Sequence, residues 1–430
     1  MGASALTMSI PLHAARRQAE YLPHLLELAL AELAVGRPAD DFLARHYREH
    51  REFGGRDRRF FSGMIFAWHR WRGWLPESLS PTAGLAAVGM LDGLTPHPAL
   101  DCLAEAAGLP SPQPLNGMSL TERAERLKSY LQLTELPELT TLVPSWIVER
   151  LYYPVALPHA AHLQACLEAF QARPALWVRH DCHAPGVPPA CPAESRPHPV
   201  LKQAVSLPAA IPPDFNPAHT RYLEVQDLAS QAVGLICAPR AGERWWDACA
   251  GAGGKTLHLA DLMAGTGEIW ATDVRPNMLK VLQRRCAKHA PAAIRVRPWR
   301  GEAAGCPPGL FDGVLVDAPC SGVGTWGRNP DARWRLAESA IDEHAARQFE
   351  LLAVAAEKVR PGGCLVYAVC TMTADETAGV TAEFARRRPD FKLCPMAHPL
   401  TGQANDGQIW IWPWEGDCNG MFVARWQRQS

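Results

Sequence analysis

Residues 244–256 read RWWDACAGAGGKT, a short apolar run followed by a glycine-rich loop. The apolar pair Trp245-Trp246 predicts a buried strand that ends at Asp247, and a helical pattern begins near residue 254. Glycine lets the backbone turn sharply and approach a ligand, while the first amides of the helix face an anion or a carboxylate. This order of strand, glycine loop and helix indicates an α/β fold with a ligand site at the loop.

The same alternation of short apolar runs and helical patterns extends from residue 231 to the end of the chain. The apolar runs that predict strands cover 244–248, 268–272, 311–316 and 364–369. The helical patterns cover about 254–264, 276–289, 338–359 and 374–388. Alternation of this kind is typical of a doubly wound, mostly parallel sheet. We therefore predict a Rossmann-like domain over residues 231–430.

The rest of the chain has a different pattern. A length of 430 residues predicts two or three domains. Helical spacing of apolar residues over 1–143, punctuated by Pro23 and Pro38, predicts an all-helical domain. Short apolar runs and a proline-rich stretch over 144–230 predict a small α+β linking domain.

Composition excludes several classes of protein. Hydrophobic residues make up 47% and charged residues 20% of the chain, as in soluble globular proteins. We expect a cytoplasmic protein without a membrane span, since neither a long apolar run nor a signal peptide is evident. The 13 cysteines include no CxxC pair, which argues against a disulfide framework or a zinc ribbon. Asp181-Cys182-His183 is the nearest approach to a metal cluster, and it lacks partners, so no metal is expected.

Two segments concentrate positive charge although the net charge of the chain is −1. Residues 45–74 carry eight arginines against three acids, interleaved with aromatic side chains, and residues 275–300 carry eight basic residues and no acid. Such segments can neutralise phosphates of a nucleic acid. They can equally be solvated helix faces, and the spacing of Trp68 and Trp71 fits one buried helix face.

Three kinds of ligand compete for the glycine loop. A dinucleotide site requires a third glycine where Thr256 stands, and a phosphate-binding P-loop requires a first glycine where Cys249 stands. An S-adenosylmethionine site requires only the loop and an acid for the ribose hydroxyls. Asp273, at the end of the next predicted strand, is placed for that task.

Two cysteines follow two of the predicted strands. The strand at 311–316 leads into Asp317 and then Cys320, and the strand at 364–369 leads into Cys370. Because ligands of such folds bind outside the carboxyl ends of the strands, these side chains can face one pocket. A single cysteine at a strand end is usually a packed small residue, but two beside a ligand loop favour chemistry.

The methylation of cytosine at carbon 5 provides a reason for cysteine at these positions. Carbon 5 is a poor nucleophile until a thiolate adds to carbon 6 and converts the ring into an enamine. A cysteine thiol has a reference pKa of only ~8.5, and its thiolate is strongly nucleophilic. An acid on the ring edge stabilises the developing charge, and a base finally removes the carbon-5 proton.

The segments DACAGAGGKT, VDAPCSGVGTWGRNPDARW and LVYAVCTMTADE resemble the signature blocks of the Sun-type RNA cytosine-5 methyltransferases. Clear likeness covers about residues 144–430 and includes YLEVQDLASQAVGLICAP before the loop and DCNGMFVARW near the end. GRDRRFFSGMIFAWHRW is similar to part of the helical domain that these enzymes share with the antitermination factor NusB. The likeness implies a Rossmann-like S-adenosylmethionine-dependent domain behind a NusB-like RNA-binding domain.

The resemblance also implies roles for individual residues. Cys370 matches the nucleophile, Cys320 matches the cysteine that helps to release the methylated base, and Asp317 matches the acid that contacts methyl donor and cytosine. Asp273 matches the ribose acid. The matched cofactor cradle comprises Cys249, Ala250, Gly251, Ala252, Gly253, Gly254 and Lys255.

The chain departs from the family pattern at four places. Ala252 stands where the loop usually has proline, and Val369 stands before the nucleophile where threonine is usual. The acid that the family has near 298–300 is missing, so Trp299 is a candidate for the adenine contact and Glu302 is the nearest acid. Cys418-Asn419 replaces a more usual Thr-Asp pair.

These observations predict an S-adenosylmethionine-dependent enzyme that forms 5-methylcytosine in RNA through a covalent adduct of Cys370 with cytosine C6. Ribosomal RNA is the expected substrate, transfer RNA is the second candidate, and the protein is expected to be a monomer. A catalytically weakened RNA-binding homologue and a nucleotide-hydrolysing enzyme are the alternatives. DNA cytosine-5 methyltransferases use the Pro-Cys cysteine itself as nucleophile and have no counterpart of Cys370.

Overall fold

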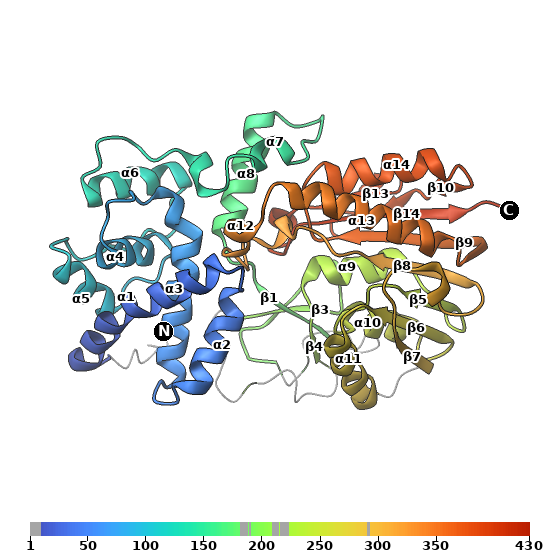
Figure 1. Cartoon of the computed structure of the whole chain (residues 1–430), viewed down its shortest axis with the longest axis horizontal. Coiled ribbons are helices and arrows are strands. Elements are labelled where there is room, and N and C mark those ends of the chain that lie inside the picture. The colour runs from blue at the N-terminus through green and yellow to red at the C-terminus, as the bar shows by residue number, and fades with distance from the viewer. Residues whose placement is uncertain (1–9, 181–187, 189–190, 209–214, 216–222, 290–292) are drawn as a thin grey trace. The chain divides into compact units, whose positions relative to one another are not determined.

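The structure, a computed structural model, describes residues 10–180, 188, 191–208, 215, 223–289 and 293–430 (Figure 1). The chain divides into two compact units, each assembled from several stretches of sequence. The first comprises Met1–Glu149, Val155–Ala172 and Trp326–Leu336, and the second comprises Arg150–Pro154, Arg173–Thr325 and Ala337–Ser430. Residues 144–230, predicted as a linking domain, are thus shared between the two units.

The first unit is helical, which confirms the prediction for the N-terminal region. Its helices are α1 (Leu12–Ala34), α2 (Ala39–Glu49), α3 (Gly55–Trp71), α4 (Pro81–Leu91), α5 (Pro98–Ala106), α6 (Leu120–Leu131), α8 (His159–Gln171) and α12 (Ala332–Arg335), while α7 (Ile147–Arg150) ends the first stretch. Pro23 does not interrupt the first helix. It lies inside α1, beside the buried Leu22, Leu25 and Leu26.

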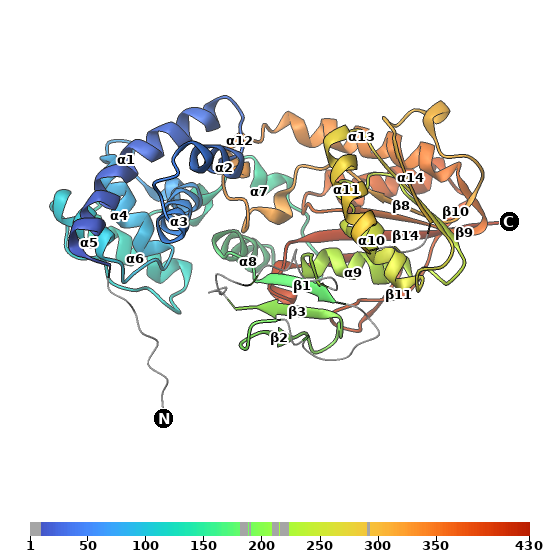
Figure 2. The ribbon, with the colours of Figure 1, turned by 90° about the horizontal axis from the view of Figure 1, so that it is seen from below.

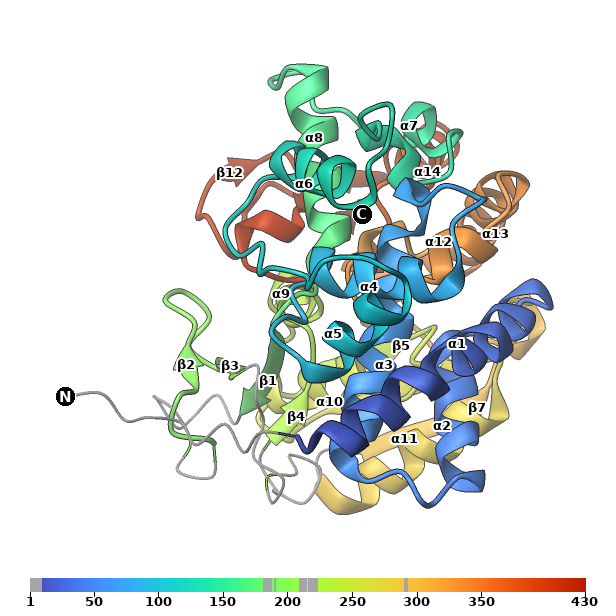
Figure 3. The same ribbon diagram turned by 90° about the vertical axis from the view of Figure 1, so that its left-hand side faces the viewer.

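Helix α4 forms the centre of this unit and packs against α1, α3, α5 and α6 (Figure 3). Every residue from Ala83 to Leu91 is buried. A Cβ atom at Gly84 would lie 2.6 Å from the ring of Trp68, and one at Gly89 would lie 2.5 Å from Leu100. Glycine at these two positions therefore allows the neighbouring helices to approach closely.

The stretch Trp326–Leu336 belongs to the helical unit although it follows the segment that contains Cys320. Its Arg333 is fully buried and donates hydrogen bonds to the backbone carbonyls of Leu142 at 2.9 Å and Phe170 at 2.6 Å. The buried Arg70 pairs with Asp92 at 2.6 Å and also donates to the carbonyl of Gly327. Hydrogen bonds to backbone oxygens satisfy a guanidinium that has been removed from water.

The second unit contains a small antiparallel sheet with the strand order β2-β3-β1-β4. Its strands are β1 (Leu176–His180), β2 (Arg196–Pro197), β3 (Ala204–Leu207) and β4 (Leu223–Val225). Val178, Val205, Leu207 and Leu223 form a hydrophobic cluster of their own. Helix α9 (Leu228–Cys237) connects this sheet to the larger sheet of the same unit.

The larger sheet has the strand order β10-β14-β9-β8-β5-β6-β7, and β13 pairs with β14. Its strands are β5 (Arg244–Asp247), β6 (Glu268–Asp273), β7 (Ala293–Pro298), β8 (Phe311–Asp317), β9 (Val359–Val369), β10 (Phe391–Leu393), β13 (Gln408–Ile411) and β14 (Met421–Arg428). The strands from β7 to β9 are parallel, whereas β14 runs antiparallel to β9. This arrangement confirms the predicted mostly parallel sheet.

Helices cover both faces of this sheet (Figure 2). One hydrophobic cluster packs α9 (Leu228–Cys237) and α10 (Gly254–Leu262) on the strands, and a second packs α13 (Ser339–Ala356) and α14 (Val380–Arg387). Helix α11 (Pro276–His289) connects β6 to β7. A parallel sheet requires cover on both faces because each crossover helix returns over one of them.

The topology places a ligand site between β5 and β8. The chain proceeds from β5 to β6 and β7 on one side, and then returns to β8 on the other side of β5. Open α/β sheets bind their ligands at such a reversal, outside the carboxyl ends of the strands. Asp247, Asp273 and Asp317 are the last residues of β5, β6 and β8, and Cys370 follows β9.

Candidate active site

The glycine loop joins β5 to α10 in a conformation that depends on glycine. Gly251 and Gly253 have φ angles of 55° and 88°, in the left-handed region. A Cβ atom at Gly253 would lie 2.1 Å from Cδ1 of Leu282, so α11 leaves no room for a side chain there. The buried Asp247 anchors the start of α10, because its carboxylate accepts a hydrogen bond from the Thr256 hydroxyl at 2.7 Å.

Asp273 stands at the end of β6 and faces the loop. Its carboxylate accepts hydrogen bonds from the Gly251 amide and the Arg275 amide, both at 2.8 Å, and from the guanidinium of Arg275 at 2.9 Å. Burial alone would raise the pKa of this carboxyl, but these hydrogen bonds outweigh it and lower the pKa below the ordinary value. Asp273 is therefore an anion that can accept hydrogen bonds from hydroxyl groups.

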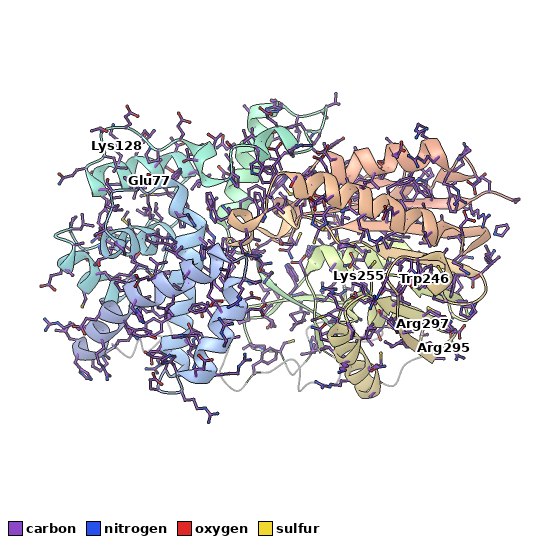
Figure 4. All side chains as sticks on the ribbon, viewed as in Figure 1. Glu77, Lys128, Trp246, Lys255, Arg295 and Arg297 are labelled. Atoms are coloured by element: carbon purple, nitrogen blue, oxygen red, sulfur yellow. The ribbon has the colours of Figure 1, made fainter. Side chains whose placement is uncertain are left out.

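Lys255, at the start of α10, reaches across to β8 (Figure 4). Its ammonium lies 2.8 Å from a carboxylate oxygen of Asp317. Burial lowers the pKa of Lys255, yet the charge and hydrogen bond of Asp317 raise it by more. The two residues thus form an ion pair at the carboxyl end of β8.

The two predicted cysteines lie next to each other. The Sγ atoms of Cys320 and Cys370 are 3.4 Å apart. The hydrogen bond from Cys320 lowers the pKa of Cys370, and the ammonium of Lys255 contributes, against the opposing effects of burial and of the Asp317 charge. The same hydrogen bond and burial raise the pKa of Cys320. The lowered pKa of Cys370 and the raised pKa of Cys320 therefore favour a thiolate on Cys370 and a thiol on Cys320.

These groups line one cavity of about 800 Å³. Gly253 is the only predicted site residue that is absent from its wall; it supports the loop by its close packing against Leu282. The predicted residues in the wall are Cys249, Ala250, Gly251, Ala252, Gly254, Lys255, Asp273, Asp317, Cys320 and Cys370. The structure thus brings the loop, the acids and the thiols into one site, as the sequence predicts.

At the place where the family has an acid, near 298–300, the structure shows how Trp299 and Glu302 lie. Trp299 lines the cavity but is only 3% exposed, because it packs edge to face on Trp246 with ring centroids 4.9 Å apart. Its indole N–H donates to the backbone carbonyl of Glu302 at 2.9 Å. Glu302 itself is not among the residues that line the cavity.

The sequence did not single out several residues that line the cavity. Arg275 covers Asp273, and Gln226, Asp227 and Ser230 reach the wall from the region before and within α9. Their signal is weak, since an arginine in a basic segment and polar residues at a helix start have many structural uses. Asp227 shows such a use, because its side chain caps α9 by accepting from the Ala229 amide at 3.0 Å.

The two basic segments have different fates in the structure. In 45–74 the aromatic side chains are largely helix core, with Phe60, Phe61 and Trp71 buried. In 275–300, Arg275 and Arg300 reach the cavity wall. Arg295 and Arg297 lie on the edge strand β7 (Figure 4).

The cavity fits S-adenosylmethionine. Asp273 offers a carboxylate for ribose hydroxyls, and the glycine loop leaves space that side chains would fill. Val274, which is 55% exposed, adds apolar surface beside Asp273. No group of three or more His, Cys, Asp or Glu side chains in the described residues could hold a metal ion, and Asp181-Cys182-His183 lies outside those residues. Among the described helices, none is long and apolar enough to cross a membrane.

Comparison with known proteins identifies relatives over most of the chain. The family model described as 16S rRNA methyltransferase RsmB/F matches residues 234–427. Ribosomal RNA small subunit methyltransferases B of Salmonella heidelberg and Salmonella typhi are each 30% identical over 347 residues, which is 77% of this chain and 77% of either relative.

Solved structures support the fold. The protein PH0851 matches 98% of this chain and 99% of its own with a TM-score of 0.71 and 23% identity. A methyltransferase homologue from Pyrococcus horikoshii matches 62% of this chain and 90% of its own with a TM-score of 0.50 and 22% identity. The curated relatives and the family match together lead to one conclusion: this chain belongs to the RsmB/F family of 16S rRNA methyltransferases, which act on RNA with S-adenosylmethionine as the methyl donor.

Proposed function

We propose that this RNA methyltransferase methylates carbon 5 of a cytosine and that Cys370 is the nucleophile. The observation that carries the proposal is the pair of thiols 3.4 Å apart at the ends of neighbouring strands, in the cavity that the glycine loop lines. A methyltransferase that acts on an exocyclic amine or a hydroxyl has no need for a nucleophilic thiolate. Activation of carbon 5 through addition to carbon 6 does need one.

The first step of the proposed reaction is the addition of the Cys370 thiolate to carbon 6. The lowered pKa of Cys370 increases the fraction of thiolate at a given pH. The C6–S bond forms as the ring double bond shifts its electrons toward the ring nitrogens and oxygen, and carbon 5 becomes nucleophilic. S-adenosylmethionine, held by the glycine loop and Asp273, supplies the methyl group.

The ion pair between Lys255 and Asp317 has two tasks in this proposal. Asp317 accepts a hydrogen bond from the exocyclic amino group of cytosine and so selects this base. The ammonium of Lys255, 2.8 Å from Asp317, offsets the negative charge that develops on the ring when the thiolate adds. Both groups are fixed before the substrate arrives, because each is held by the other.

Release of the product requires the loss of the carbon-5 proton to a base and cleavage of the C6–S bond. When Cys370 is the thiolate, the thiol of Cys320, whose Sγ lies 3.4 Å away, is the donor of the hydrogen bond between them, and it stabilises the thiolate that leaves. Without Cys320, Cys370 becomes a poorer leaving group and the covalent adduct persists. This contact gives a physical reason for the second cysteine.

The substrate is proposed to be a single-stranded or looped region of small-subunit ribosomal RNA, with transfer RNA as the second candidate. The target cytosine must leave its stack to reach a thiol inside a cavity. Arg275 and Arg300, which line this cavity, and Arg297 on β7 provide positive charge for the backbone phosphates. We propose that the enzyme acts as a monomer, which light scattering of the purified chain tests directly.

The decisive experiment compares wild type, Cys370→Ala and Cys320→Ala with labelled S-adenosylmethionine. The RNAs are 16S rRNA, assembled small subunits and transfer RNA from cells that lack the enzyme. We expect 5-methylcytosine from wild type, none from Cys370→Ala, and a covalent protein–RNA adduct on denaturing gels from Cys320→Ala. Adduct loss in Cys320→Ala with methylation retained in Cys370→Ala would reverse the two roles. A wild type that binds RNA but transfers no methyl group would favour a catalytically weakened RNA-binding homologue.

A further inference from the structure

A buried carboxylate lies beneath the two cysteines. Glu376 belongs to a π-helical turn (Asp375–Gly379) after β9 and is fully buried. It lies outside the cavity wall. Removing a carboxylate from water is costly unless donors replace the water, so its contacts define its use.

Five neutral donors surround this carboxylate. Oε1 accepts hydrogen bonds from the Ser321 amide at 2.8 Å and from the Gln348 side-chain amide at 2.9 Å. Oε2 accepts from the hydroxyls of Thr373 at 2.9 Å and Thr371 at 3.1 Å, and from the hydroxyl of Ser321. A carboxylate suits this site because it offers acceptors alone, whereas a glutamine side chain would turn an N–H₂ group toward donors.

Four of the five donors come from the two segments that carry the thiols, and the fifth, Gln348, comes from α13. Ser321 directly follows Cys320, and Thr371 directly follows Cys370. The hydroxyls of Ser321 and Thr371 also lie 2.8 Å from each other. One carboxylate therefore joins the residues next to both cysteines, while the backbone adds a hydrogen bond from the Gly324 amide to the Cys370 carbonyl.

We propose that Glu376 is a positioning residue that holds the segments of Cys320 and Cys370 together so that the Cys320 thiol donates to the Cys370 sulfur. This inference rests on the proposed function for its catalytic meaning, but the thiol contact itself can be tested without RNA. Hydrogen bonds to charged groups are stronger than neutral ones, so five of them fix the two segments firmly. Glu376 touches neither substrate nor cofactor in this role.

The test measures how fast iodoacetamide alkylates Cys370 as a function of pH in the intact protein without RNA. The titratable groups that face Cys370 are Cys320, Asp317 and Lys255. In Glu376→Gln we expect the midpoint of alkylation to rise by about one pH unit, since the Cys320 hydrogen bond is lost. We also expect kcat for methyl transfer to fall about 10- to 100-fold while KM for S-adenosylmethionine stays unchanged, as for a small misplacement of the nucleophile.

Tyr367→Phe is the matched control. Tyr367 is equally buried, and its hydroxyl donates to the Gln348 side chain at 2.8 Å and to the Glu376 backbone carbonyl at 2.7 Å without contacting the carboxylate. This variant should lose stability but keep the alkylation midpoint and kcat. Ser321→Ala, which removes one donor and keeps the amide, should shift the midpoint in the same direction as Glu376→Gln, and it serves if that variant does not fold.

The outcomes separate this inference from the proposed function. An unchanged midpoint in both Glu376→Gln and Ser321→Ala overturns the positioning role, and so does an equal shift in Tyr367→Phe. If wild type fails to form 5-methylcytosine while the midpoint shifts as expected, the positioning role stands and the proposed reaction falls. We expect the alkylation midpoint of Glu376→Asp to differ from that of wild type, because the shorter side chain cannot reach all five donors.

Discussion

Two carboxylates, one in the cavity wall on the cofactor side and one behind the thiols, are held in opposite ways. On the cofactor side, Asp273 shares its oxygens with the Gly251 amide and with Arg275, whose side chain is 58% exposed. On the thiol side, Glu376 is fully buried and accepts only from neutral donors of its own surroundings. The exposed side chain of Arg275 can turn into solvent, and another donor can then take its place on Asp273. The donors of Glu376 have no such alternative position.

One site thus combines an exchangeable contact on the cofactor side with rigid contacts on the thiol side. The cofactor must enter and leave in every cycle, so its acid is held by a partner that hydroxyl groups can replace. In the proposed reaction the thiols must meet the same ring geometry in every cycle, and the hydrogen bonds to Glu376 hold their segments in place. We therefore expect substitutions on the cofactor side to change affinity and those on the thiol side to change reactivity.

The largest effect on affinity is expected for Asp273→Asn. Loss of the charge should weaken the proposed hydrogen bonds to the ribose hydroxyls and raise the Kd for S-adenosylmethionine about 30- to 100-fold. Calorimetric titration of the purified protein measures this Kd. Glu302→Gln is the control, since this acid follows the wall residues Arg300 and Gly301 but does not line the cavity itself, and its Kd should match wild type. Equal losses in both variants would contradict the role of Asp273.

A second prediction concerns the support of the loop. Gly253→Ala adds a Cβ atom 2.1 Å from Leu282 at a φ of 88°, and should lower the free energy of unfolding by about 2–4 kcal/mol. Gly265→Ala has a similar φ of 69° with nothing within 4 Å, and should cost only about 1 kcal/mol. Urea denaturation measures both. Similar losses in the two variants would show that backbone conformation alone, rather than packing against α11, requires Gly253.

On the thiol side, the reactivity of Cys370 should depend on Cys320. The alkylation rate rises with pH as the thiol becomes a thiolate, and the lowered pKa of Cys370 moves this rise to lower pH than for an ordinary cysteine. Cys320→Ala removes the hydrogen bond but leaves burial and the Asp317 charge, which both raise the pKa, so the rise should move to higher pH. Mass spectrometry of alkylated Cys370 measures the shift. Cys249→Ala, another thiol of the cavity, should leave the profile in place.

The smallest effect is expected for Arg275→Ala. We expect hydroxyl groups of the cofactor to replace the hydrogen bonds of this arginine, so its removal frees Asp273 in advance and should tighten S-adenosylmethionine binding by no more than about threefold. RNA binding should weaken and lose part of its salt dependence, because one phosphate contact is removed. A large loss of cofactor affinity would mean that Arg275 binds the cofactor itself and that the comparison between the two sides is incorrect.

Much of this site could be predicted because its residues sit at the ends of strongly patterned strands. The runs that became β5, β6 and β8 located Asp247, Asp273 and Asp317, and the glycine loop needed only its spacing. Glu376 could not be predicted in the same way, since a glutamate at a helix start is ordinarily solvated, and only the fold buries it. The helical unit was predicted from periodicity, but its inclusion of Trp326–Leu336 depends on contacts distant in sequence.

The insertion of Trp326–Leu336 into the helical unit has a consequence for any attempt to divide the protein. The buried guanidinium of Arg333 donates hydrogen bonds to the carbonyls of Leu142 and Phe170, which a shortened chain beginning after residue 172 would lack. Such a fragment would expose an arginine and the large aromatic Trp326 on a stretch that starts six residues after Cys320. In genetic terms, the codons for the first 172 residues cannot be deleted without harm to folding. A gene encoding only the later part should yield a poorly folded product that aggregates.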